Sequence, residues 1–437
     1  MPVHGNHSIR RADLNSVEHV KTAASVEIMA PAGSYETLRA AVNAGATSVY
    51  FGVGNLNMRS GSASFQLEDL PQVASICSLK NVRSYLTVNT IMYDEDLPEA
   101  RRVCELARQA GISAVIASDI AVIEHARYLG LEVHISTQVN ISNLEAVRFY
   151  ARYADVVVLA RELTLEQIGN ICSAIEKENI CGPSGKHVGV EVFIHGAMCV
   201  AVSGKCHMSL AHYNSSANRG KCLQTCRRRY RVIDDETGEE LLIDNKFVMS
   251  PSDLCTIGIL DRLIEAGVSV LKIEGRARGP EYVDTVVRQY RKAVELIASG
   301  KFTAKTKEES LRELKKVFNR GFWENGYYLG SRLGEWAGVY GSVSTTVKIK
   351  VGKVVNFFHN NMVVEVLIES GEINRGDEIA FTGPTTGIVH SIADSIMDDD
   401  RNTVDSLKKG ASGTIKMSEM VRRNDLVFII KPRDIAQ

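Results

Sequence analysis

The sequence lacks long apolar runs and any strong net charge. No stretch approaches the roughly 18–20 consecutive apolar residues that cross a bilayer, so we expect no membrane-spanning helix. The formal net charge is −1 over 437 residues, which does not indicate a nucleic-acid binder overall, although local patches can still be basic. Residues 1–24 are polar and contain no apolar signal core, and we expect them to form a disordered tail.

Three common enzyme motifs are also missing. No Gly-x-Gly-x-x-Gly follows the first expected strand, which disfavours a dinucleotide-binding open sheet. No Gly-x-Ser-x-Gly elbow occurs, so a serine hydrolase of that type is excluded. The absence of His-Glu-x-x-His argues against a zincin protease.

Cysteine is used sparingly, but four of the nine cysteines fall within 28 residues. They are Cys199, Cys206, Cys222 and Cys226, with the spacing C-x₆-C-x₁₅-C-x₃-C. Four thiolates can bind Zn²⁺ or an iron–sulfur cluster, and a structural set without metal is the third possibility. Cys255 is a fifth candidate ligand. The odd cysteine count without a secretion signal indicates a reducing cytoplasm.

Apolar runs alternate with amphipathic helical patterns from residue 25 to residue 300, and this alternation predicts the fold. The expected strands are Glu27–Pro31, Ser48–Gly52, Ser84–Asn89, Ala114–Ser118, Glu132–Ser136, Asp155–Ala160, Glu191–Gly196 and Val270–Gly275. Helical patterns include Ser34–Ala44, Leu97–Ala110 and Asn143–Ala151. Eight such units predict a TIM-like (β/α)₈ barrel, with a doubly wound open sheet as the competing fold.

The remaining segments predict one insertion, one connector and a second domain. All the clustered cysteines lie in an excursion over residues 197–260, which follows a strand end and should fold over the mouth of the barrel. Residues 301–342 are expected to form a helical connector, with a charged helix at 311–318. Alternating patterns in residues 343–437 predict a small antiparallel β-barrel.

Polar side chains that follow the expected strands are the candidate site residues, because barrel chemistry takes place where the strands end. They include Asn89, Gln138, Arg161, His195, Glu274 and Arg276. Glu274 and Arg276 could bind a carboxylate and poise a proton, or could form only a structural ion pair at the rim. His195 could act as an acid or base, or could be merely hydrogen-bonded.

A basic block overlaps the last two clustered cysteines. It consists of Arg219, Lys221, Arg227, Arg228, Arg229 and Arg231. Such a density of cations can neutralise several phosphates, and Tyr230 offers a stacking surface beside it. The alternatives are a solvated helix face or hydrogen bonding directed at the cysteine sulfurs.

Several of these residues fall into an ordered set of motifs that resembles a known family. The string Glu191-x-Phe-x-His-Gly-Ala-x-Cys199-x₆-Cys206-x-x-Ser209 resembles the signature of the collagenase-like peptidases, family thirty-two of the peptidases of unknown type. Supporting matches are Ala30-Pro-Ala-Gly, Val49-Tyr-Phe-Gly, Asn57-Met-Arg59, Asp253-Leu and Lys272-Ile-Glu-Gly-Arg. The segment Asn374-Arg-Gly-Asp-Glu-Ile resembles the small β-barrel of translation factors.

The resemblance carries a functional expectation. Some members are described as proteases without an agreed nucleophile, and others hydroxylate RNA or ubiquinone and carry a four-cysteine [4Fe–4S] cluster. The similarity is greatest to the branch that hydroxylates the wobble uridine of tRNA at C5 with prephenate. The cluster would then bind Cys199, Cys206, Cys222 and Cys226, although some relatives use a position that matches Cys255 as the fourth ligand.

The same resemblance suggests roles for the candidate residues, with tRNA and a dicarboxylate as partners. The expected catalytic residues are His195, Glu274 and Arg276. The expected substrate-binding residues are Arg59, Arg161, Gln138 and Asn89, with the two carboxylates of prephenate on arginines. The expected RNA-binding residues are Arg219, Lys221, Arg227, Arg228 and Arg229. A collagenase-like peptidase and a non-enzymatic RNA-binding scaffold remain the alternative functions.

Overall fold

Eight parallel strands close into a ring in the computed structural model, which describes residues 26–60, 65–203, 205–231, 233–240, 249–324, 336–339 and 341–433. The ring strands are β1 (Glu27–Pro31), β2 (Ser48–Phe51), β3 (Arg83–Val88), β4 (Ala114–Ala117), β5 (Glu132–Ile135), β6 (Val156–Val158), β7 (Gly189–Gly196) and β9 (Val270–Ile273). Strand β9 pairs with both β1 and β7 and closes the ring. All eight predicted strands are therefore confirmed, and the open sheet is ruled out. The predicted tail at residues 1–24 lies outside the described residues.

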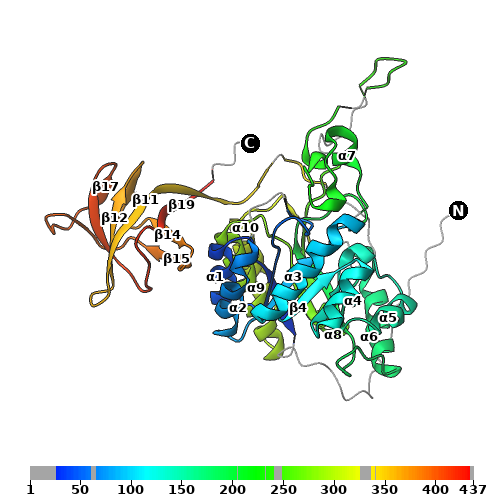
Figure 1. The fold of residues 1–437 in the computed structure, drawn as a ribbon. Coiled ribbons are helices and arrows are strands. Elements are labelled where there is room, and N and C mark those ends of the chain that lie inside the picture. The colour runs from blue at the N-terminus through cyan, green and yellow to red at the C-terminus, as the bar shows by residue number, and fades with distance from the viewer. Residues whose placement is uncertain are drawn as a thin grey trace.

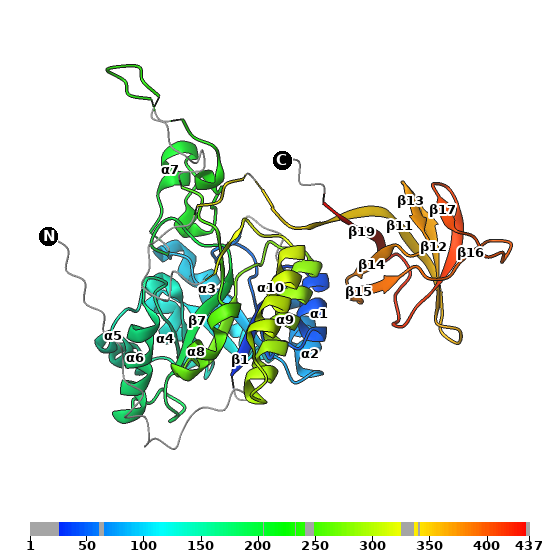
Figure 2. The ribbon, with the colours of Figure 1, turned by 180° about the vertical axis from the view of Figure 1, so that it is seen from behind.

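Helices surround the ring and cover its outer face (Figures 1 and 2). They are α1 (Tyr35–Asn43), α2 (Leu70–Ser78), α3 (Leu97–Ala110), α4 (Ile120–Tyr128), α5 (Leu144–Ala151), α6 (Leu165–Lys177), α8 (Leu260–Glu265) and α9 (Pro280–Ala298). Side-chain caps fix the first turns of several of them. In α1 the Ser34 hydroxyl accepts from the Thr37 amide, and the Thr37 hydroxyl accepts from the Ser34 amide. None of the described helices is long and apolar enough to cross a membrane.

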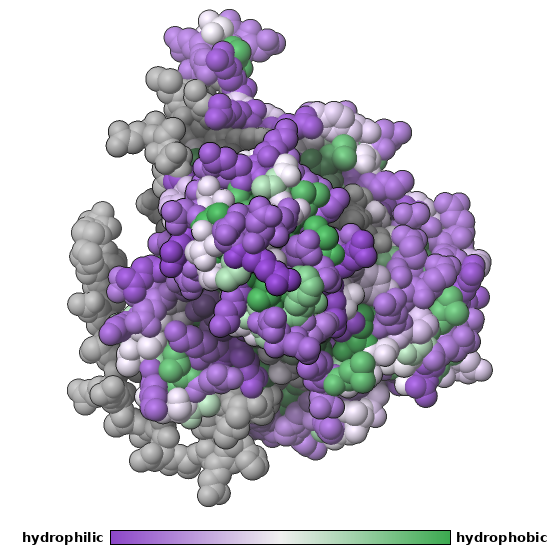
Figure 3. Space-filling view, turned by 90° about the vertical axis from the view of Figure 1, so that its left-hand side faces the viewer, coloured by the Kyte–Doolittle hydropathy of each residue, from purple (hydrophilic) through white to green (hydrophobic). Residues whose placement is uncertain are grey.

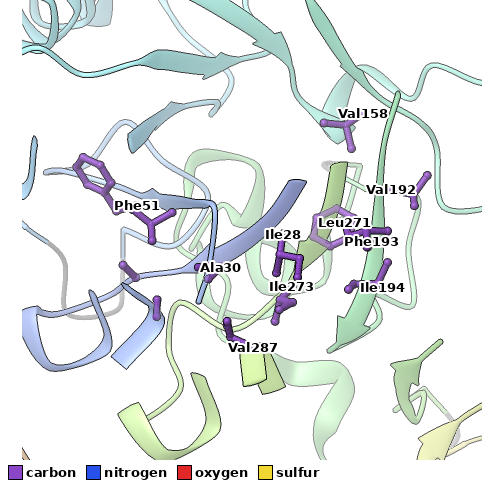
Figure 4. Packing of buried hydrophobic residues seen from close by; sticks show 14 of the residues in the cluster. Ile28, Ala30, Phe51, Val158, Val192, Phe193, Ile194, Leu271, Ile273 and Val287 are labelled. Carbon is purple, nitrogen blue, oxygen red and sulfur yellow. The ribbon is translucent and has the colours of Figure 1, made fainter. Parts of the chain in front are cut away.

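The main hydrophobic core lies between the ring and its helices. In Figure 4, Ile28 of β1, Ile273 of β9 and Ile194 of β7 lie near Val287 of α9, and all four belong to one buried cluster. Because the strands are covered on both faces, most of their residues are apolar, and buried polar exceptions such as His134, Glu191 and Lys272 lie on β5, β7 and β9. A second, smaller apolar cluster with Tyr85 and Ile116 fills part of the ring interior.

The insertion between β7 and β9 begins where β7 ends. It contains helix α7 (Met208–Tyr213), which lies at one end of the barrel (Figure 1), and a short strand β8 (Asp253–Cys255). Strand β8 pairs antiparallel with β7 outside the closed ring, and β10 (Phe322–Trp323) then pairs with β8. The sequence analysis missed both strands because they are only 3 and 2 residues long. In the connector the helix is α10 (Ala304–Lys316), which begins earlier than the predicted 311–318.

The C-terminal region is an antiparallel sheet around its own core. The strands are β11 (Thr346–Phe358), β12 (Val363–Ile368), β13 (Glu372–Asn374), β14 (Glu378–Gly383), β15 (Gly387–Ile392), β16 (Ile396–Asp398), β17 (Ser406–Lys408), β18 (Ser412–Lys416) and β19 (Leu426–Pro432). Seven of them pair in the order β15-β14-β19-β11-β12-β18-β16, and β13 pairs with β17. Register shifts in β11 bend the sheet around one buried cluster. Pairings among the described strands leave β15 and β16 as edges.

The C-terminal sheet contacts the barrel through β15 and α1. Gly387 opens β15 with a positive φ of +77°, and a Cβ there would lie 2.8 Å from the Arg39 Cβ. An ion pair of 2.5 Å between Lys348 and Glu281 adds a second link between β11 and α9. The molecular face on the side of this sheet is mostly hydrophilic, with hydrophobic residues in small scattered groups (Figure 3).

Substituting Gly387 with alanine should weaken this contact. Gly410 is the matched control, because its φ is +88° but a Cβ there would meet nothing within 4 Å. Both substitutions carry the backbone strain of a left-handed alanine, about 1–2 kcal/mol. We expect Gly387→Ala to cost about 1–3 kcal/mol more than Gly410→Ala in urea unfolding of the full chain. If both variants lost the same free energy of unfolding, the close approach of β15 to α1 would not contribute to stability.

Candidate active site

A pocket of about 190 Å³ opens at the ends of the barrel strands and is partly walled by the insertion. Ten of the predicted site residues line it, and six of these follow barrel strands: Arg59, Asn89, Gln138, Arg161, Glu274 and Arg276. The insertion contributes Met198, Cys199, Cys222, Gln224, Cys226 and Arg227. The ring and the insertion therefore meet around one cavity.

Glu274 is the anionic centre of this pocket. Its carboxylate accepts from the Arg59 guanidinium at 2.9 Å and from the Tyr50 hydroxyl at 3.1 Å. Burial by itself would raise the pKa of Glu274, but the charges of Arg59, Arg161 and Arg276 outweigh it and lower the pKa to about 2. Glu274 is thus ionised at neutral pH and paired. It holds Arg59 in place, and its predicted role in poising a proton stays a prediction.

Arg276 is held in the pocket by hydrogen bonds to Asn57 and Thr87. Its guanidinium donates to Asn57 Oδ1 at 3.0 Å and to Thr87 Oγ1 at 2.8 Å. Asn57 in turn packs over Gly52, where a Cβ would lie 2.5 Å from the Asn57 Cγ. The Arg276 Nε atom is buried and has no hydrogen-bond partner among the described residues. An unpaired buried donor carries a desolvation cost, and the Arg276 side chain as a whole lines the pocket.

Arg161 is fixed by the aromatic ring of Phe193. The guanidinium carbon lies 4.0 Å from the ring centroid, and the Nη1 atom donates to the Ala197 carbonyl at 3.2 Å. In the described part of the chain its buried Nε atom also lacks a partner. Arg161 and Arg276 thus line the same cavity.

A polar shelf completes the barrel side of the pocket. Asn89 Nδ2 donates to Ser136 Oγ at 3.0 Å and to Gln138 Oε1 at 3.2 Å, and Ser136 also hydrogen-bonds to Gln138. The Met58 amide donates to Asn89 Oδ1 at 3.3 Å. The amide groups of Asn89 and Gln138 are consequently oriented before any ligand binds.

His195 does not line the pocket, which corrects its predicted catalytic role. It is 1% exposed and is surrounded by the rings of Tyr282, Tyr290 and Phe322. A register shift between Phe193 and His195 in the pairing of β7 with β9 breaks the alternation that would put both on one face. Burial lowers the pKa of His195 to about 3, so the ring is neutral.

The four clustered thiols are neighbours. Cys199, Cys222 and Cys226 line the pocket. Burial raises the pKa of the Cys226 thiol, Arg227 opposes this, and the negative charges of the other three thiols add to the rise. All nine cysteines are free, and no three His, Cys, Asp or Glu side chains of the described ranges converge in metal-binding geometry. The donor set of four thiols nevertheless fits a soft metal centre in its chemistry and its number.

Cys255, the alternative fourth ligand, lies apart from these four. It is fully buried on β8, where it is paired with His195 across the strands. Its sulfur lies 4.0 Å from the Tyr290 hydroxyl, and burial raises the pKa of its thiol to about 12. This placement favours Cys226 as the fourth member of the set.

The structure divides the predicted RNA-binding block into two groups. Arg227 points inward and donates to Ser250 Oγ at 3.1 Å, to the Pro251 carbonyl at 2.7 Å and to the Met198 carbonyl. Arg219 forms a bidentate ion pair with Asp96 and lies 4.1 Å from the Tyr93 ring. These two arginines hold the insertion in place, and their predicted RNA-binding role stays a prediction. Lys221, Arg228 and Arg229 are exposed on the outside of the insertion.

Sequence analysis did not single out Lys272 and Tyr50 as pocket residues. Lys272 is two positions before Glu274 on β9, so both side chains point to the same face of the strand. Its Nζ atom lies 4.6 Å from the Tyr50 ring centroid and donates to Glu191 at 2.6 Å. The period-two rule applied to Lys272-Ile-Glu-Gly-Arg could have found this lysine.

The fold and the pocket define a (β/α)₈-barrel protein with a thiol-rich insertion over a cationic cavity. The family model described as Peptidase family U32 matches residues 33–338, and the chain belongs to this family. The resemblance read from the motifs is thereby confirmed.

Two curated relatives have different names. A "Collagenase" of Porphyromonas gingivalis (strain ATCC BAA-308 / W83) is 53% identical over 93% of this chain and 98% of its own. The "tRNA hydroxylation protein P1" of Bacillus subtilis (strain 168) is 32% identical over 87% of this chain and 89% of its own. The solved structure of the U32 peptidase Mk0906 covers 60% of this chain and 99% of its own at 11% identity, with a TM-score of 0.37.

Proposed function

We propose that the chain is an RNA-modifying enzyme that hydroxylates the wobble uridine of tRNA at C5, with prephenate as the small co-substrate. The observation that carries the proposal is the meeting of cationic side chains and a four-thiol set around one small pocket. Prephenate has two carboxylates, and bidentate guanidinium groups suit carboxylates in strength and geometry. Arg161 and Arg276 both line the pocket, which supports them as the carboxylate-binding groups.

The thiol set is proposed to hold a [4Fe–4S] cluster through Cys199, Cys206, Cys222 and Cys226. A bound cluster of this type would supply one-electron chemistry next to the pocket. The chain's own residues bind and orient the substrate. Glu274 fixes Arg59, and the hydrogen bond between Asn89 and Gln138 orients their amide groups. The insertion forms part of the cavity wall and shields it from water. This assignment fits a reducing compartment such as the cytoplasm.

A buried base must leave its stack to reach such a pocket. The RNA backbone would then lie along the insertion, past Lys221, Arg228 and Arg229. Arg228 lies 5.0 Å from the ring of Tyr213, which is itself 48% exposed and offers a stacking surface. The relative named as a tRNA hydroxylation protein supports an RNA substrate.

The test is nucleoside analysis of tRNA from a deletion strain. We expect 5-hydroxyuridine derivatives to be absent, to return with the wild-type gene, and not to return with the Arg276→Met variant. A deletion strain with unchanged tRNA nucleosides would overturn the proposal, and tRNA affinity without any missing nucleoside would favour the RNA-binding scaffold.

A peptidase is the second candidate, favoured by the relative named as a collagenase. Among the described residues that line the pocket there are three cysteines but no histidine, so no thiol–imidazole pair is formed there. Purified protein incubated with denatured collagen discriminates the two functions. Cleavage that scales with protein concentration and persists in excess tRNA would favour the peptidase.

Basic residues on the outside of the insertion should contribute to RNA binding. We expect Lys221→Gln and Arg228→Gln each to weaken tRNA binding about 2–10-fold. Each should also reduce the slope of log affinity against log salt concentration by about 1, the value for one phosphate contact. Arg101→Gln, an exposed change on α3, is the control and should leave the affinity unchanged. The measurement is fluorescence anisotropy at several salt concentrations. An unchanged salt slope in both variants would remove the insertion from the RNA-binding surface.

A further inference from the structure

A column of charged side chains crosses the barrel interior beneath the pocket. Lys272 Nζ lies 2.6 Å from Glu191 Oε1, and Glu191 Oε2 lies 3.6 Å from His134 Nδ1. His134 Nε2 lies 3.0 Å from Glu132 Oε1. The side chains of Glu191 and His134 are 0% exposed. Four neighbouring groups that can each gain or lose a proton thus form a continuous chain from β9 through β7 to β5.

The two ends of the column reach different faces of the barrel. At the upper end Lys272 lines the pocket and lies between the rings of Tyr50 and Phe193, 4.6 and 5.4 Å from their centroids. At the lower end Glu132 pairs with Arg83 at 2.6 Å, and the Arg83 side chain is 42% exposed. Glu132 and Arg83 are the first residues of β5 and β3, so this end lies at the opposite rim from the pocket.

Filling the barrel interior with these charged side chains costs folding free energy. Barrel interiors are normally packed with branched apolar side chains, and buried charges carry a desolvation cost that must be offset. Glu27, Glu132 and Glu191 supply three negative charges here, against the cations Arg83 and Lys272. Charge balance is reached when His134 is protonated.

The surroundings of His134 favour its protonated form. Burial by itself would lower the pKa of His134, but Glu132 and Glu191 outweigh burial and raise it. Tyr85 also lies against the His134 ring, at 4.6 Å between centroids, and burial keeps this phenol neutral by raising its pKa. Both carboxylates thus stabilise the imidazolium form of His134, and an imidazole can accept a proton on one ring nitrogen and release one from the other.

One link in the column is weak. Neither His134 Nδ1 nor Glu191 Oε2 has a hydrogen-bond partner within the described ranges, and the 3.6 Å between them is long for a hydrogen bond. Glu191 is held instead by Lys272. An anion bound in the pocket would compete with Glu191 for the lysine charge and leave Glu191 to depend on His134. Pocket occupancy and His134 protonation are then thermodynamically linked.

We propose that Lys272, Glu191, His134 and Glu132 form a proton relay that supplies the pocket from the amino-terminal rim of the barrel. Lys272 gives its proton to the bound group, Glu191 passes the His134 proton to Lys272, and His134 is reprotonated from water through Glu132. Each transfer breaks one N–H or O–H bond and forms another, so the net change is one proton moved from water to the pocket. The route would matter when RNA covers the mouth, and only the identity of the ligand rests on the proposed function.

The linkage can be measured on the full-length protein without any reaction. In a histidine NMR titration we expect the His134 pKa to lie above 6.5 and to rise by about 0.5 or more with saturating prephenate or malonate. Lys272→Met should produce a similar rise without ligand, because Glu191 loses its other partner. A His134 titration that is the same in the wild type and in Lys272→Met would overturn the relay.

Calorimetry provides the second measurement. At a pH near the His134 pKa measured by NMR, binding of the dicarboxylate in two buffers of different ionisation enthalpy should show net proton uptake, which His134→Gln abolishes. His125→Gln is the matched control, since His125 lies 3.6 Å from Glu105 on the helix layer and should leave the uptake intact. Uptake that survives in His134→Gln would overturn the relay. If this variant does not fold, the wild-type NMR titration decides.

Turnover separates the relay from the proposed function. His134→Gln should weaken dicarboxylate binding about threefold or more, as the linkage requires, slow hydroxylation about 100-fold and flatten its pH profile. Hydroxylation at the wild-type rate in a folded His134→Gln variant would overturn the relay alone. A wild-type protein that shows linked proton uptake but no hydroxylation would overturn the proposed function and support the relay.

Discussion

Replacing Cys222 with serine is expected to remove the metal centre and the hydroxylation activity together. Anaerobically purified wild-type protein should be brown and contain about four irons and four acid-labile sulfides per chain. A serine oxygen is a harder ligand than a thiolate and cannot replace it in a soft four-sulfur set. Because Cys222 also lines the pocket, we expect nucleoside analysis to find no hydroxylated uridine in a strain that carries this variant.

Two other cysteines serve as controls for this experiment. Cys181 lies outside the insertion and is partly exposed, so Cys181→Ser should keep the full iron content. Cys255→Ala should also keep it, since Cys255 is buried on β8 away from the other four thiols. Full iron content in Cys222→Ser would contradict the ligand set. A colourless wild-type protein with one zinc would remove the cluster from the mechanism and bring the peptidase and scaffold functions level with hydroxylation.

Replacing Glu274 with glutamine is expected to produce the largest change in stability. The side chain is 13% exposed, and its pKa is lowered from an ordinary value of 4.5 to about 2 by the surrounding arginines. This difference corresponds to about 3 kcal/mol of folding free energy at neutral pH. Since the folded-state pKa is depressed, the contribution is complete above pH 4.5 and is lost as the pH falls towards 2.

Urea unfolding at several pH values tests this expectation. The free-energy difference between wild type and Glu274→Gln should be full at pH 7 and should shrink steadily below pH 4.5. Glu295→Gln is the control, because Glu295 is 62% exposed and pairs with Arg291 only on the surface of α9. It should change stability by less than about 1 kcal/mol. A difference for Glu274→Gln that does not depend on pH would show that its ionisation is not the source of the stabilisation.

Most of the barrel could be predicted because its strands are covered on both faces. Such strands are mostly apolar, as in Ala114-Val-Ile-Ala, and Gly or polar residues separate them from the helices. Strand β8 has only three residues, and its position is set by pairing with β7, which is distant in sequence. Strand β15 alternates weakly and packs on α1 through Gly387, a contact that no local pattern encodes.

The site was predictable where position along a strand decides which way a side chain points. Glu274 and Arg276 follow β9, and both line the pocket as expected. His195 follows the same rule on β7 but is turned away by the register shift after Phe193, which depends on pairing with β9. Arg227 and Arg228 are adjacent and chemically identical, yet one binds the carbonyls inside the insertion and the other contacts Tyr213, and only tertiary contacts separate them.

The pairing of β10 with β8 has a practical consequence for cutting this protein into pieces. Helix α9 ends the last βα unit of the ring at Ala298, so a fragment ending near residue 300 would look complete. Such a fragment would lose Trp323, which is 4% exposed and pairs with Leu254, and would also lose the ion pair of Arg320 with Asp253. Strand β8 would then be an open edge beside the root of the insertion. A fragment designed to fold alone should therefore extend at least through Trp323. The connector is part of the barrel domain, because it pairs with β8 and holds that strand in place.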